Sequence, residues 1–368
     1  MTGVNTKLGS VPDISAASAA SNSAAKPFPW PAAAATGIGS VPGTSPAEAI
    51  AVILGELPDF PHLPELPARG PGSDLAGRTA ALLVDMPVET SPRGWRFALR
   101  PGRDQRHAAG LLAEDLDAVQ QAAEGYAGPF KIQVAGPWTL AAAVELSRSQ
   151  DPALADPGAV ADLIASLAEG VAGHVAEVRQ RIPAATVVLQ LDEPALPAVL
   201  AGGVPTASGL NRVGAVDTTV TGDGLRAVLT AAAAFSVVHC CAPDYPFQLI
   251  KDSGAGAISI DISQLPRGAE DDLAELAEAG LGILAGALDT KDAERMSAAA
   301  SPAPKELAGS VIELWHRTGL PRARLAEQVV ITPACGLAGF SAAGARAALA
   351  SCRDAARILP ELLAEGSP

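Results

Sequence analysis

The spacing of apolar and polar residues becomes regular from about residue 111. Short unbroken apolar runs alternate there with longer stretches in which apolar residues recur every three or four positions. The short runs predict strands, and the longer stretches predict amphipathic helices. The predicted strands are 130–134, 186–191, 235–239, 257–261, 281–288 and 329–332, and the predicted helices are 111–125, 140–146, 157–180, 222–234, 245–253, 271–279, 305–318 and 341–363.

Runs that are apolar at successive positions are typical of a parallel sheet buried on both faces. A further short strand begins at Ala35, and Ser45 is placed to cap the helix that follows it, with Pro46 at the first helical position. This alternation of strands and helices, over a chain of 368 residues, predicts an α/β fold with a single (β/α)8 TIM barrel.

Two segments depart from this pattern. Residues 1–34 are rich in Ala, Ser and Pro, and we expect a flexible, disordered N-terminal tail before a catalytic barrel domain at 35–368. Residues 58–110 contain many prolines and predict an irregular insertion after the first helix. Within the insertion we expect a helix at 73–83 and a hairpin or extended arm around 93–100.

Composition narrows the class of protein. The formal net charge is −14 and the sequence pI is about 4.8, which argues against nucleic acid or an anionic membrane surface as a partner. We find no apolar run of membrane-spanning length and no apolar core of signal-peptide type. Four cysteines in a chain of this length predict no disulfide framework, so we expect a cytoplasmic protein.

Polar residues of chemical interest follow the predicted strands. Because the carboxyl ends of the strands form one rim of a TIM barrel, we expect these side chains to lie together. They are Ser40, Asp192, Glu193, His239, Cys241, Asp261, Asp289 and Cys335. One imidazole, two thiolates and a carboxylate suit a four-coordinate Zn²⁺. The alternative for each cysteine is simple packing in the core, which is what we expect of Cys240 and Cys352.

Six short motifs resemble the catalytic barrel of cobalamin-independent methionine synthase, in the uroporphyrinogen decarboxylase/methionine synthase-like superfamily. They occur in that family's order between residue 36 and about residue 340. The two most specific are Gln-Leu-Asp-Glu-Pro-Ala-Leu at 190–196 and the set of His239, Cys241 and Cys335. The others are Ile-Gly-Ser-Val-Pro at 38–42, Gly-Pro-Trp-Thr at 136–139, Ile-Ser-Ile-Asp at 258–261 and Pro-Ala-Cys-Gly-Leu at 333–337.

The resemblance implies a role for each matching residue. His239, Cys241 and Cys335 are expected to hold zinc, with Asp261 at the position of the family's glutamate ligand. Asp192 is expected to bind the substrate amino group, and Ile38, Gly39 and Ser40 its carboxylate. Glu193 is a further substrate-binding candidate, and Asp289 joins Asp192 as a catalytic candidate.

The sequence departs from the family in four places. Asp261 is one methylene shorter than the family's glutamate, and Lys291 replaces a histidine. The tryptophan that stacks on folate is not found at its place, where residues 142–146 are small and apolar. A glutamate that contacts the substrate amine has no clear counterpart near residues 74–78.

The predicted function is therefore transfer of a methyl group to the thiol of homocysteine by a zinc-dependent methyltransferase, forming methionine. The donor is either methyl-folate or a methylcobalamin/corrinoid protein. Two alternatives remain open: a zinc-dependent alkyltransferase that acts on another thiol, and a non-catalytic zinc-binding relative.

Overall fold

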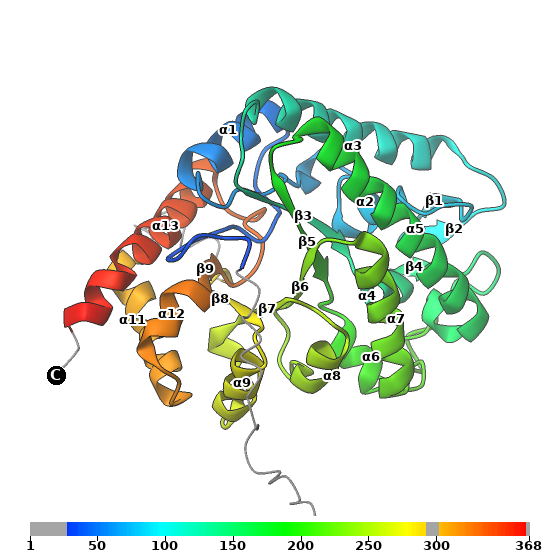
Figure 1. Ribbon diagram of the computed structural model, residues 1–368. Coiled ribbons are helices and arrows are strands. Elements are labelled where there is room, and N and C mark those ends of the chain that lie inside the picture. The colour runs from blue at the N-terminus through cyan, green and yellow to red at the C-terminus, as the bar shows by residue number, and fades with distance from the viewer. Residues whose placement is uncertain (1–27, 292–301, 366–368) are drawn as a thin grey trace, which may run out of the picture.

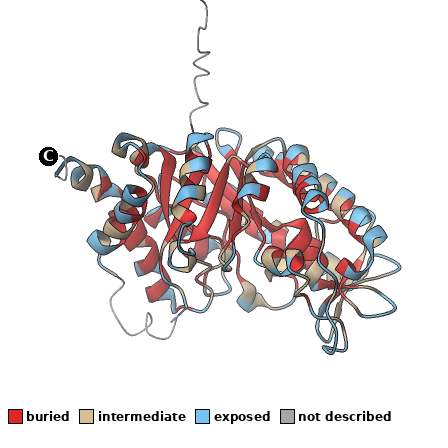
Figure 2. Ribbon diagram, turned by 90° about the horizontal axis from the view of Figure 1, so that it is seen from below, coloured by how far each residue is buried: buried red, intermediate tan, exposed pale blue. Residues whose placement is uncertain are grey.

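The computed structural model describes residues 28–291 and 302–365. Its centre is a curled sheet of six parallel strands in the order β3-β5-β6-β7-β8-β9. Their bounds are β3 (Pro129–Ala135), β5 (Thr186–Asp192), β6 (Phe235–Cys240), β7 (Ala257–Asp261), β8 (Gly282–Leu288) and β9 (Val329–Pro333). Nearly every residue in these strands is buried, which confirms the prediction of a parallel sheet covered on both faces (Figure 2).

Two extended segments lie between the outer strands β9 and β3. Ala35 bridges Ile331 of β9, Ser40 bridges Glu65, and His62 bridges Lys131 of β3, all in parallel orientation. Backbone hydrogen bonds accompany each bridge, as from the Leu63 amide to the Lys131 carbonyl at 2.8 Å. Each contact is an isolated bridge rather than a regular ladder, because prolines interrupt the chain around residues 58–67.

Helices surround the sheet (Figure 1). They are α1 (Pro46–Glu56), α2 (Leu75–Ala80), α3 (Arg103–Ala122), α4 (Pro137–Ala143), α5 (Pro157–Arg181), α6 (Leu196–Leu200), α7 (Thr218–Ala232), α8 (Phe247–Asp252), α9 (Ala269–Glu278), α11 (Pro304–Arg317), α12 (Arg322–Gln328) and α13 (Ala342–Glu365). Ser45 caps α1 as predicted, since its side chain accepts a hydrogen bond from the Glu48 amide at 3.3 Å. The short helix α12 was not predicted.

The irregular insertion contains a second, smaller sheet. Strands β1 (Val88–Ser91) and β2 (Gly94–Phe97) form the expected hairpin, and β2 pairs in parallel with β4 (Val144–Glu145). The predicted helix at 140–146 therefore ends early, at Ala143.

A separate apolar cluster closes the amino ends of the strands. Trp30 is 4% exposed; its ring stacks on Phe28 at 5.0 Å and meets Phe235 edge-on at 5.2 Å. A Cβ on Gly282 would lie 2.5 Å from the Trp30 ring, so glycine there leaves room for the indole. The expectation of a flexible tail falls mainly on residues outside those described. The domain division at residue 34 stays a prediction.

One helix, α5, is long and apolar enough to cross a membrane by length and composition alone. Its buried residues, among them Leu163, Leu167 and Val171, belong to the main core cluster, and the helix packs on α7 and β5. This is the expected behaviour of a helix that covers a sheet with one apolar face. The cytoplasmic setting remains a prediction.

Candidate metal and substrate site

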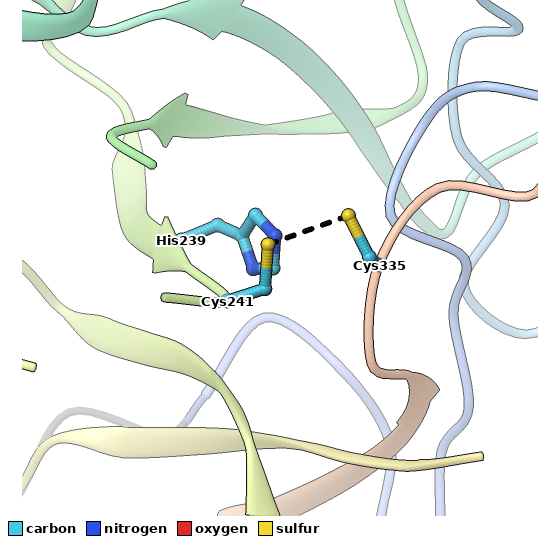
Figure 3. A group of neighbouring side chains, drawn as sticks. All are labelled: His239, Cys241 and Cys335. Carbon is cyan, nitrogen blue, oxygen red and sulfur yellow. Dashed lines mark hydrogen bonds between the residues drawn. The ribbon is translucent and has the colours of Figure 1, made fainter. Parts of the chain in front are cut away.

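Three side chains that could bind a metal ion converge at the carboxyl ends of the strands (Figure 3). His239 is the penultimate residue of β6, Cys241 follows that strand, and Cys335 lies two residues beyond β9. Their ligand atoms all lie within 4.8 Å of one another, with 3.4 Å between the two sulfurs. Since β7 and β8 separate β6 from β9 in the sheet, it is the curl of the sheet that brings these residues together.

The donor set and its spacing suit Zn²⁺. Two sulfurs that each lie about 2.3 Å from a tetrahedral zinc ion are roughly 3.8 Å apart, close to the separation found here. His239 Nδ1 lies 2.9 Å from Ser259 Oγ in a buried hydrogen bond, which leaves Nε2 as the nitrogen able to bind a metal. The residues present therefore fit a zinc ion.

The two thiols are unequal. The hydrogen bond from the Cys241 thiol, helped by His239, lowers the pKa of Cys335 to about 4, whereas the same bond and burial raise the pKa of Cys241. Cys335 therefore gives up its proton readily, and the resulting thiolate is the form of cysteine that binds a metal. By contrast, burial raises the pKa of Cys240 to about 12, and this side chain packs in the core as predicted.

Asp261 lies outside the group of three. Its Oδ1 accepts hydrogen bonds from the Ser263 amide at 2.9 Å and from Ser263 Oγ at 2.6 Å. Its Oδ2 lies 3.3 Å from Lys291 Nζ, the lysine that replaces the family's histidine. Both oxygens thus have partners on the chain, and a role for Asp261 as zinc ligand stays a prediction.

A cavity of about 280 Å³ opens beside the three ligands. Its wall includes His239, Cys241 and Cys335, and it also includes the predicted substrate residues Ile38, Ser40 and Asp192. Gly39 links two segments of this wall, since its carbonyl accepts a hydrogen bond from the Glu65 amide at 3.2 Å.

Gly336 follows Cys335 in the same wall. A Cβ on Gly336 would lie 2.0 Å from Ser40 Oγ, so only glycine leaves the serine room. The Leu337 amide also donates to the Ser40 carbonyl at 2.7 Å. The chain around Cys335 therefore packs directly against the predicted carboxylate-binding segment.

Two buried carboxylates line this cavity beside the partly exposed Asp74, and sequence reasoning identified one of the two. Burial raises the pKa of Asp192 to about 6, and Gln190 Nε2 donates to its Oδ1 at 2.7 Å. Glu65, which was missed, is buried in the same wall, and burial raises its pKa to about 7. Its Oε1 has no hydrogen-bond partner among the described residues. A single glutamate within a proline-rich segment carries no periodic signal that could have singled it out.

Two other predicted site residues do not line the cavity. Glu193 is fully buried, but its oxygens accept the Trp138 amide at 3.0 Å and the Thr139 amide at 2.8 Å, at the N-terminus of α4. Asp289 is exposed, and it accepts the Lys291 amide at 2.9 Å. The structure thus brings Asp192 to the cavity, holds Glu193 against α4 and leaves Asp289 in a turn.

A second, larger cavity of about 640 Å³ adjoins the first, and Asp74 belongs to the wall of both. The hairpin β1–β2 contributes Arg93 and Trp95, and the end of α4 contributes Ala142 and Ala143. These alanines lie in the stretch 142–146, where the folate-stacking tryptophan was not found. The missing indole therefore coincides with open space in this second cavity, which shares Asp74 with the cavity beside His239, Cys241 and Cys335.

Comparison with known proteins agrees with this geometry. The family model described as "Cobalamin-independent synthase, Catalytic domain" matches residues 33–358. The chain belongs to this family. The match confirms the resemblance seen in the six motifs, and at family level it indicates a methyltransferase of methionine biosynthesis.

A solved B12-independent methionine synthase from Shewanella sp. W3-18-1, in complex with selenomethionine, has the same fold. It is 13% identical, with a TM-score of 0.52, over 91% of this chain and 100% of that one. The α subunit of tryptophan synthase from Legionella pneumophila is a more distant match, 13% identical with a TM-score of 0.26, over 66% of this chain and 98% of that one. No curated protein is similar enough in sequence to match the chain.

Proposed function

We propose that this protein is a zinc-dependent methyltransferase that transfers a methyl group to the thiol of homocysteine and forms methionine. One observation carries the proposal: His239, Cys241 and Cys335 converge within 4.8 Å at a cavity whose wall also holds two buried carboxylates. Homocysteine bound with its thiol at the proposed metal ligands can thus direct its amino group toward the carboxylates. Family membership supports the same reaction.

The cavity suits the amino-acid half of homocysteine. Asp192 and Glu65 offer carboxylate oxygens, and Glu65 Oε1 accepts no hydrogen bond from the described residues, although Arg78 Nε lies 3.9 Å away as an ion-pair partner. An α-ammonium supplies three N–H donors, so we assign these two residues to the amine. Ser40 and the backbone of residues 38–40 lie in the same wall, where we place the substrate carboxylate.

The reaction requires the substrate thiol as its thiolate. Zn²⁺, when bound, supplies a Lewis acid that favours the thiolate at neutral pH. The chain's own part is to place the sulfur: the carboxylates hold the amine, the Ile38–Ser40 segment holds the carboxylate, and the walls of the cavity limit water. The sulfur forms a bond to the methyl carbon while the bond between this carbon and the donor breaks.

We propose methyl-folate as the donor, and the adjoining cavity as its place. The two cavities share Asp74 in their walls, so a donor in the larger one would lie next to the thiol. Family membership supports a folate donor, and neither comparison supports a corrinoid protein partner. Because residues 142 and 143 are alanines, we propose that Trp95 or Arg93 takes part in holding the donor.

We also propose that the two bridged segments count as the first two strands of a (β/α)8 barrel. Three parallel bridges, at Ala35, Ser40 and His62, support this assignment. It places the Ile38–Ser40 segment at a strand end beside the metal ligands, in keeping with the position of active sites in such barrels.

The test compares zinc content and homocysteine binding in three proteins: wild type, Cys335→Ser and the matched control Cys352→Ser. Cys352 is a buried core thiol in α13, outside the cavity. We expect about one zinc per chain in wild type and in the control, and loss of zinc in Cys335→Ser. Addition of homocysteine to the zinc protein should release about one proton per site. Methionine formation is then measured with methyl-folate.

The outcomes separate the alternatives. Absence of zinc from the wild type would overturn the proposal. A zinc protein that does not respond to homocysteine but responds to another thiol is an alkyltransferase with a different acceptor. A zinc protein that responds to neither is a non-catalytic relative.

A further inference from the structure

The mechanism above gives no role to Lys131, a buried lysine. Lys131 is on β3 and its side chain is fully buried, so burial lowers the pKa of its ammonium to about 7. It does not line the cavity. A lysine buried in a barrel interior is costly unless its charge and its donors are matched by the surroundings. The contacts of Lys131 therefore indicate its role.

Lys131 Nζ donates a hydrogen bond to the Ile38 carbonyl at 2.7 Å. Gln190 Nε2 donates to the same carbonyl at 3.0 Å, and also to Asp192 Oδ1 at 2.7 Å. One backbone oxygen thus receives two buried donors, immediately before Gly39 and Ser40. These bonds fix the segment proposed to bind the substrate carboxylate, and they tie it to the carboxylate proposed to bind the amine.

The charge of Lys131 also acts on both amine-binding residues. Its ammonium opposes the effect of burial on the pKa of Glu65 and on that of Asp192. It makes its hydrogen bond to Ile38 rather than to either carboxylate. The carboxylates therefore gain a neighbouring positive charge, while the hydrogen bond of Lys131 goes to the Ile38 carbonyl and not to their oxygens.

We propose that Lys131 is a positioning residue that prepares the cavity for the α-amino-acid half of its substrate. It holds the Ile38–Ser40 segment through the Ile38 carbonyl, and it balances Glu65 and Asp192 without contacting the substrate. This inference rests on the proposed function, since it presumes that an amino acid occupies the cavity. It predicts that Lys131 governs recognition of the amino acid and leaves the thiol and metal chemistry unchanged.

The experiment measures binding of L-homocysteine, L-methionine and ethanethiol to the zinc-loaded protein by calorimetry. Wild type is compared with Lys131→Met, which keeps the length of the side chain but removes its positive charge and its hydrogen-bond donor. A second variant, Lys131→Gln, keeps a donor for the Ile38 carbonyl and removes only the charge. Zinc content and circular dichroism of each variant are recorded alongside.

We expect Lys131→Met to weaken the binding of both amino acids by about tenfold or more, with ethanethiol binding and zinc content unchanged. Lys131→Gln should show a smaller loss. Equal weakening of ethanethiol, or unchanged binding of the amino acids, would overturn the inference. Should Lys131→Met not fold, the same comparison with Lys131→Gln decides. If wild type binds neither amino acid, the proposed function itself has failed.

Discussion

Glu65 and Asp192 lie in one cavity wall, and their negative charges repel each other. Burial is the main reason that the pKa of Glu65 rises to about 7, and the Asp192 charge adds to it, while Arg78 and Lys131 act in the other direction. Such a pair is stabilised by a bound cation, because the cation offsets both the burial and the repulsion. At the scale of single residues, this is why we propose that the wall binds the ammonium group of an amino acid, in addition to the neighbouring Arg78 and Lys131.

Replacement of Glu65 by Gln tests this directly. The change removes one charge at nearly constant volume, so we expect homocysteine binding to weaken by roughly 10- to 100-fold, the range for loss of a charged hydrogen bond. The measurement is calorimetric titration of zinc-loaded protein with L-homocysteine. Asp289→Asn is the matched control, because Asp289 is exposed and outside the cavity. Equal affinity for wild type and Glu65→Gln would show that Glu65 does not contact the amine.

Residues that follow regular strands could be predicted from the sequence, and Glu65 could not. His239, Cys241 and Asp192 stand at the ends of apolar runs, where a parallel barrel places its chemistry. Glu65 belongs to a segment that makes one isolated bridge and has no repeating pattern. The side-chain direction of Glu193 was equally hidden, because sequence spacing does not reveal that the N-terminus of α4 would take up its oxygens.

At the scale of elements, the start of α4 depends on Glu193. Two amides in the first turn of the helix and the Thr139 hydroxyl all donate to this carboxylate. A Cβ on Gly136 would lie 2.3 Å from Glu193 Oε1, so glycine is required for this approach. The arrangement anchors α4 to the end of β5, next to Asp192, and thereby helps to shape the wall of both cavities.

We therefore expect Glu193→Ala to lower the free energy of unfolding by about 3 kcal/mol, because buried amides lose their acceptor. Burial raises the pKa of Glu193 from its ordinary 4.5 to about 7. A carboxyl with a raised pKa contributes stability that is complete below about pH 4.5 and is lost as the pH rises to about 7. The stability difference between wild type and Glu193→Ala should thus shrink from about pH 5 to about pH 7.5.

Urea unfolding followed by tryptophan fluorescence at several pH values measures that difference. Glu278→Ala, on the exposed side of α9, is the control and should cost little at any pH. A difference that grows with pH would mean that the ionised form of Glu193 is the stabilising one.

Most helices and strands of the regular half of the chain agree with their predictions to within a few residues, because their apolar periodicity is strong. The helix predicted at 111–125 is an exception, since it begins eight residues earlier, as α3 at Arg103–Ala122. The strand at 281–288 and the helix at 341–363, for example, appear as Gly282–Leu288 and Ala342–Glu365. The extended segment that contains His62 and Glu65 could not be predicted, because it is held by contacts with β3 and not by its own pattern. The short helix α12, between α11 and β9, has too few turns to show periodicity.

At the scale of the whole molecule, stability and chemistry are placed at opposite ends of the sheet. Trp30 and Phe28 close the amino ends of the strands, against Phe60 and Phe235, whereas the proposed metal ligands lie at the carboxyl ends. The Trp30 indole also donates to the Glu327 carbonyl at 3.2 Å, just before β9. This division is the one expected of a barrel, and it makes a specific prediction.

Trp30→Ala should lower the free energy of unfolding by about 3–5 kcal/mol, since it empties a buried aromatic site. Zinc affinity of the folded protein should remain within about threefold of wild type, because a substitution at one end of the strands acts nearly independently of a distant site at the other end. Urea unfolding and competition with a zinc-binding dye measure the two quantities. Leu99→Ala, at a site that is 94% exposed, is the control and should change neither. If Trp30→Ala lowered zinc affinity as strongly as it lowers stability, the amino-end cluster and the metal site would form one cooperative unit, and the separation inferred from their positions would be wrong.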